Sequence, residues 1–270
     1  MKRRQAILAA LLRENTLSVR TLADRFRVSP MTIYRDLQQL ERQGRVIRTV
    51  GGAMIRPTLQ YGPRWSERFQ KQADVKRRLG AAAAALLREG ETVLLDAGTT
   101  ILEVAHHVSA SSHLTVVTNS LPAAAALGEC AGITVLMPGG EYHAETASLL
   151  GPVATNFLRD IHADTLLLST AAVSLDQGLT NFSMDSVAMK RAMIAQARRV
   201  ILVADYTKFR QQALMTVAPI TAVHILLTDT RLPLSIRHRL EQLGIQLLLV
   251  PDNEEADPFN TVDPKRASGK

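Results

Sequence analysis

The sequence has little of several residue types that mark whole classes of protein. Its 270 residues include one cysteine, Cys130, which excludes an internal disulfide and suits a reducing cytoplasm. Aromatic residues make up only 4% of the chain while 46% is hydrophobic, so the core must be largely aliphatic. No apolar run approaches the roughly 20 residues that a membrane-spanning helix needs. We therefore expect a cytoplasmic protein without a membrane partner.

The sequence motifs of metal sites and of nucleotide-binding sites are missing as well. The histidines do not have the spacing of zinc ligands, and a single cysteine offers no thiolate cluster. Neither a Walker phosphate-binding loop nor a complete GxGxxG is present. We expect no metal site and no cofactor.

Acidic residues are scarce at the start of the chain. Residues 1–78 contain 18 Lys and Arg but 6 Asp and Glu, a net charge of +12, whereas residues 79–270 carry a net charge of −5. A basic segment of this kind is typical of proteins that contact nucleic-acid phosphates. The acidic remainder argues against a second nucleic-acid surface.

Residues 17–53 have the pattern of a winged helix-turn-helix. A short positioning helix is predicted by apolar residues at helical spacing, which are Val19, Leu22, Ala23 and Phe26. Ser29 is suited to cap the next helix, and Pro30 to occupy its first position. A short strand over residues 45–49 and a Gly51-Gly52 turn complete the wing. A small basic interaction module is the alternative.

The second helix would leave polar side chains on its outer face, where base edges are read. Arginines at positions 20, 45 and 48 would hold phosphates. We therefore expect double-stranded DNA to be contacted through Arg20, Ser29, Met31, Thr32, Tyr34, Arg35, Gln38, Arg45, Arg48, Gly51 and Gly52.

The chain divides into four predicted parts. Residues 1–56 form the DNA-binding domain, residues 57–73 a linker, residues 74–250 an α/β domain and residues 251–270 a disordered tail. Within the α/β domain, aliphatic strands are predicted at Thr92–Leu95, Thr115–Thr118, Ile133–Met137, Thr165–Ser169, Val200–Ala204, Val223–Thr228 and Gln246–Val250. Helices are predicted at Asp74–Arg88, Thr100–Val108, Leu121–Leu127, Val153–Ile161, Ser186–Ala197 and Leu234–Leu243. This alternation predicts a doubly wound, mostly parallel sheet.

Polar and glycine residues follow several predicted strands. In a doubly wound sheet the ligand lies at the carboxyl ends of the strands, and a helix N-terminus there favours an anion. We therefore expect a small anionic ligand near Asp96, Gly98, Thr99, Thr100, Asn119, Ser120, Gly139, Gly140, Asp205 and Lys208. Asp96 has an equal alternative as a structural acceptor at the sheet edge.

Motifs along most of the chain resemble the DeoR family of bacterial transcriptional regulators. They are SPMTIYRDLQQLERQG with GGA in the first part, then LLDAGTT, VVTNSLPAA, MPGGEY, QGLT, MKRAMI and ADYTKF. The resemblance implies a repressor of sugar or polyol catabolism with an isomerase-like effector domain that binds phosphorylated sugars. It adds Lys190 to the expected effector contacts, with a solvated helix lysine as the alternative reading.

The chain departs from the family pattern at three places. Tyr34 stands where an arginine is frequent and Val50 where a histidine is frequent, so operator preference differs at those contacts. The run 169–173, Ser-Thr-Ala-Ala-Val, replaces a Gly-Ala-Asp-like run, which leaves a sugar acid or its phosphate open as effector.

The same run bears on catalysis. Isomerases of this fold carry acidic residues there and a glutamate on the next helix, whereas this chain has Lys190-Arg191. Without paired carboxylates no general base is evident, so we expect no enzymatic activity. The alternatives are an isomerase-like enzyme with an accessory DNA-binding domain and an architectural DNA-binding protein without an effector. The expected protein is a homo-oligomeric regulator, a dimer or tetramer on repeated half-sites.

Overall fold

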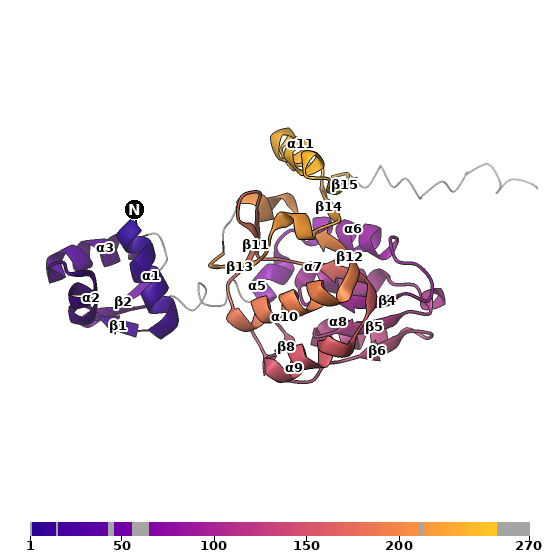
Figure 1. The fold of residues 1–270 in the computed structure, drawn as a ribbon, viewed down its shortest axis with the longest axis horizontal. Helices are drawn as coiled ribbons and strands as arrows, with labels where there is room; N and C mark the ends of the chain where they lie inside the picture. The colour runs from indigo at the N-terminus through magenta and orange to yellow at the C-terminus, as the bar shows by residue number, and fades with distance from the viewer. Residues whose placement is uncertain (1, 15, 43–45, 56–64, 211–212, 253–270) are drawn as a thin grey trace, which may run out of the picture.

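The computed structural model of the chain describes residues 2–14, 16–42, 46–55, 65–210 and 213–252. These residues form two units, 2–55 and 65–252, each with its own hydrophobic core (Figure 1). No helix among these residues is long and apolar enough to cross a bilayer.

The N-terminal unit is the winged helix-turn-helix that the sequence predicts. Its elements in chain order are α1 (Lys2–Glu14), β1 (Thr16–Ser18), α2 (Val19–Phe26), α3 (Pro30–Arg42), β2 (Val46–Thr49) and β3 (Gly52–Ile55). The strands form an antiparallel sheet in the order β1-β3-β2. The three helices pack around fully buried aliphatic side chains that include Ile7, Leu22, Ile33 and Leu37. Burial of these side chains holds α3 in place with its polar face outward.

Local signals in the sequence set the ends of these helices. The Ser18 hydroxyl accepts a hydrogen bond from the Thr21 backbone N–H at 3.0 Å and caps α2. Arg27 ends α2 in the left-handed region, with φ of 51°. The Ser29 hydroxyl then accepts from the Thr32 N–H at 3.3 Å before Pro30 opens α3. In the wing, Gly51 takes φ of +80°, a conformation that favours glycine.

The second unit is built on a seven-stranded sheet whose pairs are all parallel. All seven predicted strands are present, and they are β4 (Thr92–Leu95), β5 (Thr115–Thr118), β6 (Thr134–Leu136), β9 (Ala163–Leu168), β12 (Ala197–Val203), β14 (Ile225–Asp229) and β15 (Gln246–Val250). Their order is β15-β14-β12-β9-β4-β5-β6. The chain thus winds outward from β4 in one direction and from β9 in the other, so the junction of β4 and β9 is the topological switch point.

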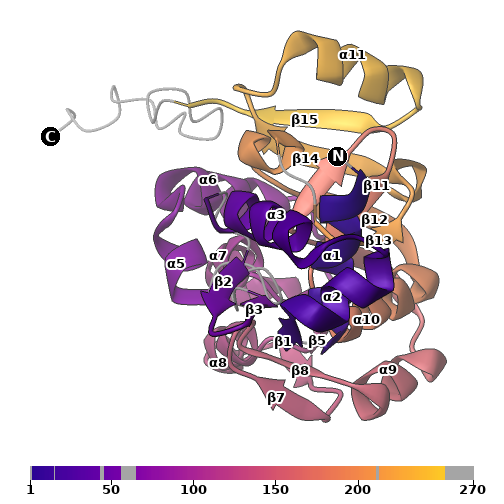
Figure 2. The ribbon, with the colours of Figure 1, turned by 90° about the vertical axis from the view of Figure 1, so that its left-hand side faces the viewer.

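Helices cover both faces of this sheet. On one face lie α6 (Ala73–Ala84), α7 (Thr99–His107) and α8 (Leu121–Gly128). On the other lie α9 (Pro152–Phe157), α10 (Met184–Gln196) and α11 (Leu234–Gln242), with α11 beside the edge strand β15 (Figure 2). Along β4, Val93 and Leu95 point into the first layer and Leu94 into the second. Burial on both faces explains the continuous aliphatic strands.

Several short elements were not predicted. They are the hairpin of β7 (Glu141–His143) and β8 (Ser148–Leu150), the antiparallel sheet of β10 (Ala172–Ser174), β11 (Gly178–Asn181) and β13 (Met215–Ala218), and the 3-10 turns at Ala110–Ser112, Leu158–Asp160, Tyr206–Arg210 and Ile220–Ala222. These strands have only three or four residues, too few for a clear alternation. The segment expected as a linker contains a helix, α5 (Trp65–Gln70), and most of the expected tail lies outside the described residues.

Candidate functional site

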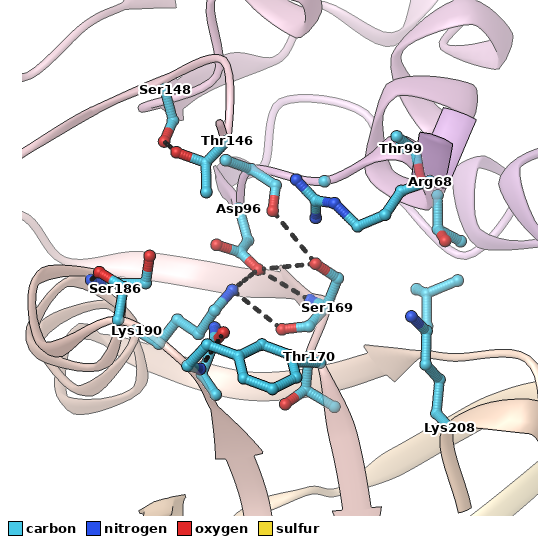
Figure 3. Close-up of a pocket in the computed structure, with 18 of the residues that line it drawn as sticks. Arg68, Asp96, Thr99, Thr146, Ser148, Ser169, Thr170, Ser186, Lys190 and Lys208 are labelled. Carbon is cyan, nitrogen blue, oxygen red and sulfur yellow. Dashed lines mark hydrogen bonds and ion pairs between the residues drawn. The ribbon is translucent and has the colours of Figure 1, made fainter. Parts of the chain in front are cut away.

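A pocket opens at the carboxyl ends of the strands, over the switch point (Figure 3). Its floor is formed by the residues that follow β4 and β9, and its walls come from α5, the start of α6, the start of α7, the β7–β8 hairpin, α10 and the turn after β12. The pocket therefore lies where the topology predicts a ligand.

Asp96 joins the two strands that part at the switch point. One of its carboxylate oxygens, Oδ2, accepts hydrogen bonds from the Ser169 backbone N–H at 2.9 Å and from the Ser169 hydroxyl at 3.1 Å. The same oxygen pairs with the Lys190 ammonium group, which also donates to the Ser169 carbonyl at 3.0 Å. Both charged side chains are buried. Lys190 is thus not a solvated helix lysine, and Asp96 is a structural acceptor as well as part of the pocket floor.

Cations outnumber carboxylates along the pocket wall. Five basic side chains line it, Arg68, Lys71, Lys76, Lys190 and Lys208, against two acidic ones, Asp96 and Asp205. Asp96 is already neutralised by Lys190. The Asp205 carboxylate accepts hydrogen bonds from the Thr207 backbone N–H, at 3.0 Å, and from the Thr207 hydroxyl. The Lys208 ammonium group forms no hydrogen bond or ion pair with any residue in the described part of the chain, so the pocket has a surplus of positive charge.

This surplus is visible in the acidity of the basic groups. Burial, with the nearby charge of Lys208, lowers the pKa of Lys76 from its ordinary 10.5 to about 8. Burial is also the largest cause of the lowered pKa of Lys208; the charge of Asp205 opposes it and the charge of Arg68 adds to it. Burial lowers the pKa of Arg68 against the opposing charge of Asp96. Cations that are desolvated and close to one another favour an anion that would neutralise them.

The start of α7 adds further donors. Gly98 precedes this nine-residue helix and no side chain caps its first turn, so the backbone N–H groups there are open to a ligand. A Cβ atom at this position would lie 2.6 Å from the Ser169 hydroxyl oxygen, so a larger residue would displace the hydroxyl that donates to Asp96. Thr99 and Thr100 also line the pocket, and their hydroxyls add to the donors.

Another part of the pocket lining is polar but uncharged. It contains Asn119, Thr146, Ser148, Asn181 and Ser186. Asn119 donates from Nδ2 to the Leu149 carbonyl at 3.1 Å, whereas its buried Oδ1 atom accepts no hydrogen bond from the described residues. A buried acceptor without a donor is costly, and a ligand hydroxyl would satisfy it.

Most of the residues predicted for the effector site meet in this pocket. They are Asp96, Gly98, Thr99, Thr100, Asn119, Lys190, Asp205 and Lys208. Three others do not line it. The Ser120 hydroxyl is used to cap α8, where it accepts from the Ala123 N–H at 3.3 Å. Gly139 and Gly140 follow the edge strand β6, away from the switch point, and pack near α9.

The sequence missed the contribution of the segment before the α/β domain. Arg68, Lys71 and Gln72 fall in the expected linker, and Lys76 opens a run of three cations, Lys76-Arg77-Arg78, that is typical of a solvated helix face. The only hint was the aromatic pair in this segment. The Trp65 and Phe69 rings stack at 5.1 Å and mark a helix rather than an extended linker.

The expected DNA-contacting residues that the structure describes all belong to the N-terminal unit. Met31, Tyr34, Arg35 and Gln38 are exposed on α3, with Met31 62% and Tyr34 40% accessible. The Thr32 hydroxyl is engaged with that of Ser29 at 2.9 Å. Arg20 and Gly51 are exposed, and Arg48 lies 3.8 Å from Glu41. Gly52 is buried between β1 and β2, and Arg45 lies outside the described residues.

Comparison with known proteins covers both units. The family model described as the DeoR-like helix-turn-helix domain matches residues 3–58, and the DeoR C-terminal sensor domain matches residues 71–230. An uncharacterized HTH-type transcriptional regulator, YgbI of Escherichia coli, is 34% identical and covers 92% of this chain and 97% of its own. The glycerol-3-phosphate regulon repressor of E. coli is 31% identical, covering 92% and 98%.

One solved structure extends the comparison. The full-length sorbitol operon regulator SorC of Klebsiella pneumoniae is 12% identical, with a TM-score of 0.41 over 84% of this chain and 94% of that one.

Among the described residues there is no group of three or more metal-ligating side chains.

Anion binding in this pocket should weaken as the solution becomes alkaline. Because the pKa of Lys76 is lowered to about 8, Lys76 is charged near neutrality and loses its charge as the pH rises through that value. Calorimetric titration with inorganic sulfate, whose charge is constant between pH 7 and pH 9, should therefore show a falling affinity. Lys76→Met should bind more weakly at pH 7 and show a shallower pH profile; an unchanged profile would contradict this role for Lys76.

The folded chain itself should show the opposite trend. The pKa of Lys76 is lowered on folding, so the unfolded chain binds more protons between the two values, and the contribution of this group to the stability of the folded state rises with pH from about 8 toward 10.5. The pH dependence of the unfolding midpoint, compared between the wild-type chain and Lys76→Met, isolates this contribution.

Proposed function

The chain belongs to the DeoR family of DNA-binding transcriptional regulators, and from this premise we propose that it is a repressor released by a phosphorylated, hydroxyl-bearing metabolite. The α/β unit would hold this metabolite at the switch point. The N-terminal unit would hold the operator, with α3 in the major groove.

The observation that carries the proposal is the excess of partly buried positive charge in the pocket. Neither Lys208 nor Arg68 forms an ion pair with a carboxylate in the described part of the chain, and burial lowers the pKa of each although Asp205 and Asp96 act in the opposite sense. A phosphate group would accept hydrogen bonds from both cations and from the first turn of α7. A neutral ligand would leave these charges partly desolvated and without a counter-charge.

The uncharged wall supports a ligand with hydroxyl groups rather than a bare anion. Asn119 offers a free buried oxygen, and Thr146, Ser148 and Ser186 also line the pocket, with the first two hydroxyls hydrogen-bonded to each other at 2.7 Å. A sugar phosphate or sugar-acid phosphate combines both features. The name of the E. coli relative, the glycerol-3-phosphate regulon repressor, is consistent with this class.

The pocket is better suited to binding a ligand than to catalysing its conversion. Both of its carboxylates are engaged, Asp96 with Lys190 and Ser169 and Asp205 with Thr207. A general base needs a carboxylate that is free to take a proton from the substrate. The pocket therefore favours a sensor over an isomerase.

DNA recognition would depend on the exposed face of α3. A single winged unit makes few base contacts, so a homo-oligomer on repeated half-sites is proposed. The exposed Arg35 side chain is suited to bidentate hydrogen bonding with a guanine. The metabolite must bind the DNA-competent and incompetent states with different affinity, since otherwise it could not change operator binding.

A panel of phosphorylated compounds tests the pocket. Glycerol 3-phosphate, glucose 6-phosphate and 6-phosphogluconate, each beside its unphosphorylated counterpart, should separate into binders and non-binders in calorimetry. Lys208→Met should weaken the binders about tenfold or more, because a charge-assisted hydrogen bond is lost.

Arg77→Met is the matched control for this panel. It removes a cation from the exposed face of α6, where Arg77 pairs with Asp74 at 3.3 Å. Its affinity for the panel should equal that of the wild-type chain. Equal binding of phosphorylated and unphosphorylated compounds would contradict the proposal.

A gel-shift assay on the region upstream of the gene tests DNA reading. Arg35→Ala should lower the affinity for specific DNA about tenfold or more while the affinity for random duplex changes little, because a base contact is lost. Arg42→Ala removes the same charge from the exposed last turn of α3 and should change the ratio of specific to random binding little. If Arg35→Ala left that ratio unchanged, α3 would be wrongly assigned.

A further inference from the structure

The short helix α5 (Trp65–Gln70) occupies a particular place in the chain. It is the first described element after the N-terminal unit, and the two family models leave residues 59–70 unmatched. Any change in the α/β unit that is to reach the DNA-binding unit through the chain must pass this segment. How α5 is held in place therefore bears on regulation.

The contacts that hold α5 to the α/β unit are mainly polar. None of its residues is buried, and Phe69 is 40% exposed although its ring stacks on Trp65. The helix lies against α7. The Arg68 guanidinium donates to the Glu145 carbonyl at 3.1 Å, and the Lys76 ammonium donates to the Arg68 carbonyl. Little apolar surface is buried by these contacts, so α5 is held weakly compared with a core helix.

Arg68 extends from α5 into the pocket. Figure 3 shows its guanidinium reaching inward from the wall, on the side away from Lys190. Its Nε atom is buried and has no hydrogen-bond partner in the described part of the chain, and the same is true of the Trp65 Nε1 atom on the same helix. Buried donors without acceptors cost free energy in this docked position. An acceptor supplied by a ligand would satisfy the Arg68 donor.

The other end of the segment is fixed to the α/β unit. Gln72 joins α5 to α6 in the left-handed region, with φ of 55°. Its side-chain oxygen accepts from the Arg231 guanidinium at 3.3 Å, and Arg231 in turn pairs with Asp229 at 2.8 Å. Gln72 is therefore an anchored point from which α5 can dock or lift.

We propose that Arg68 couples the pocket to the DNA-binding unit. A phosphate group that contacts Arg68 on one side and Lys208 with the start of α7 on the other bridges α5 to the α/β unit. The ligand then binds more tightly when α5 is docked than when it is lifted, and it shifts the equilibrium toward the docked state by that difference in affinity. This inference rests on the proposed function, because it takes the same anion as its cause.

The chain contains its own reporter of this step. Trp65 is the single tryptophan among 270 residues, and it lies on α5 three positions before Arg68. Its fluorescence therefore follows the surroundings of α5 without a label. Inorganic phosphate is the probe, titrated at constant ionic strength against sodium chloride, with binding measured by calorimetry on the same protein.

Two variants separate coupling from binding. Arg68→Met and Lys208→Met each remove one cation from the same pocket, and each should weaken phosphate binding about tenfold. At saturating phosphate, Lys208→Met should keep the full change in Trp65 emission, whereas Arg68→Met should lose it. Circular dichroism should match the wild-type chain for both because neither side chain belongs to a core cluster, and the unfolding midpoint should not fall because a desolvated charge is removed.

The outcomes are distinct. Phosphate binding by the wild-type chain without a change in Trp65 emission would overturn the coupling while leaving the anion site intact, and so would an undiminished emission change in Arg68→Met. The absence of any phosphate binding to the wild-type chain would overturn the proposed function itself, and the coupling with it.

Discussion

The arrangement of the α/β unit depends on how the ends of β4 and β9 are joined where they part. The connections leave these two strands in opposite directions, which opens a gap above the sheet. Asp96 closes its floor, since one carboxylate oxygen accepts from the Ser169 backbone and side chain and pairs with Lys190 from α10. The charges of Asp96 and Lys190 neutralise each other, so this ion pair has no net charge with which to attract a ligand.

The remaining cations then determine the chemistry of the pocket. Arg68, Lys76 and Lys208 come from three different segments, and burial lowers the pKa of each. Folding brings these charges together and partly desolvates them, which costs free energy. A bound anion would offset this cost. Arg68 belongs to α5, the segment that leads to the DNA-binding unit, so an anion that binds Arg68 also acts on that segment. Sensing and signalling thus depend on the same charges.

The sequence predicted the fold well and the site in part. Continuous aliphatic runs such as Val93–Leu95 and capping signals such as Ser29-Pro30 depend only on neighbouring residues. The strand and the helix start that they predict are therefore found where expected. Strand order is not local, and for that reason Gly139 and Gly140 were expected in a pocket from which the edge position of β6 removes them. Nor can a sequence tell which cation of Lys76-Arg77-Arg78 is buried. Lys76 is buried and Arg77 is exposed because of the tertiary packing of α6.

The central claim is that the cations without carboxylate partners at the switch point bind a phosphate group. A crystal structure with glucose 6-phosphate or 6-phosphogluconate tests it most directly. We predict that the phosphate lies within hydrogen-bond distance of the Lys208 ammonium, the Arg68 guanidinium and the backbone N–H groups of Thr99 and Thr100, with a sugar hydroxyl on Asn119 Oδ1. A phosphate bound elsewhere, with this pocket occupied only by solvent, would contradict the claim.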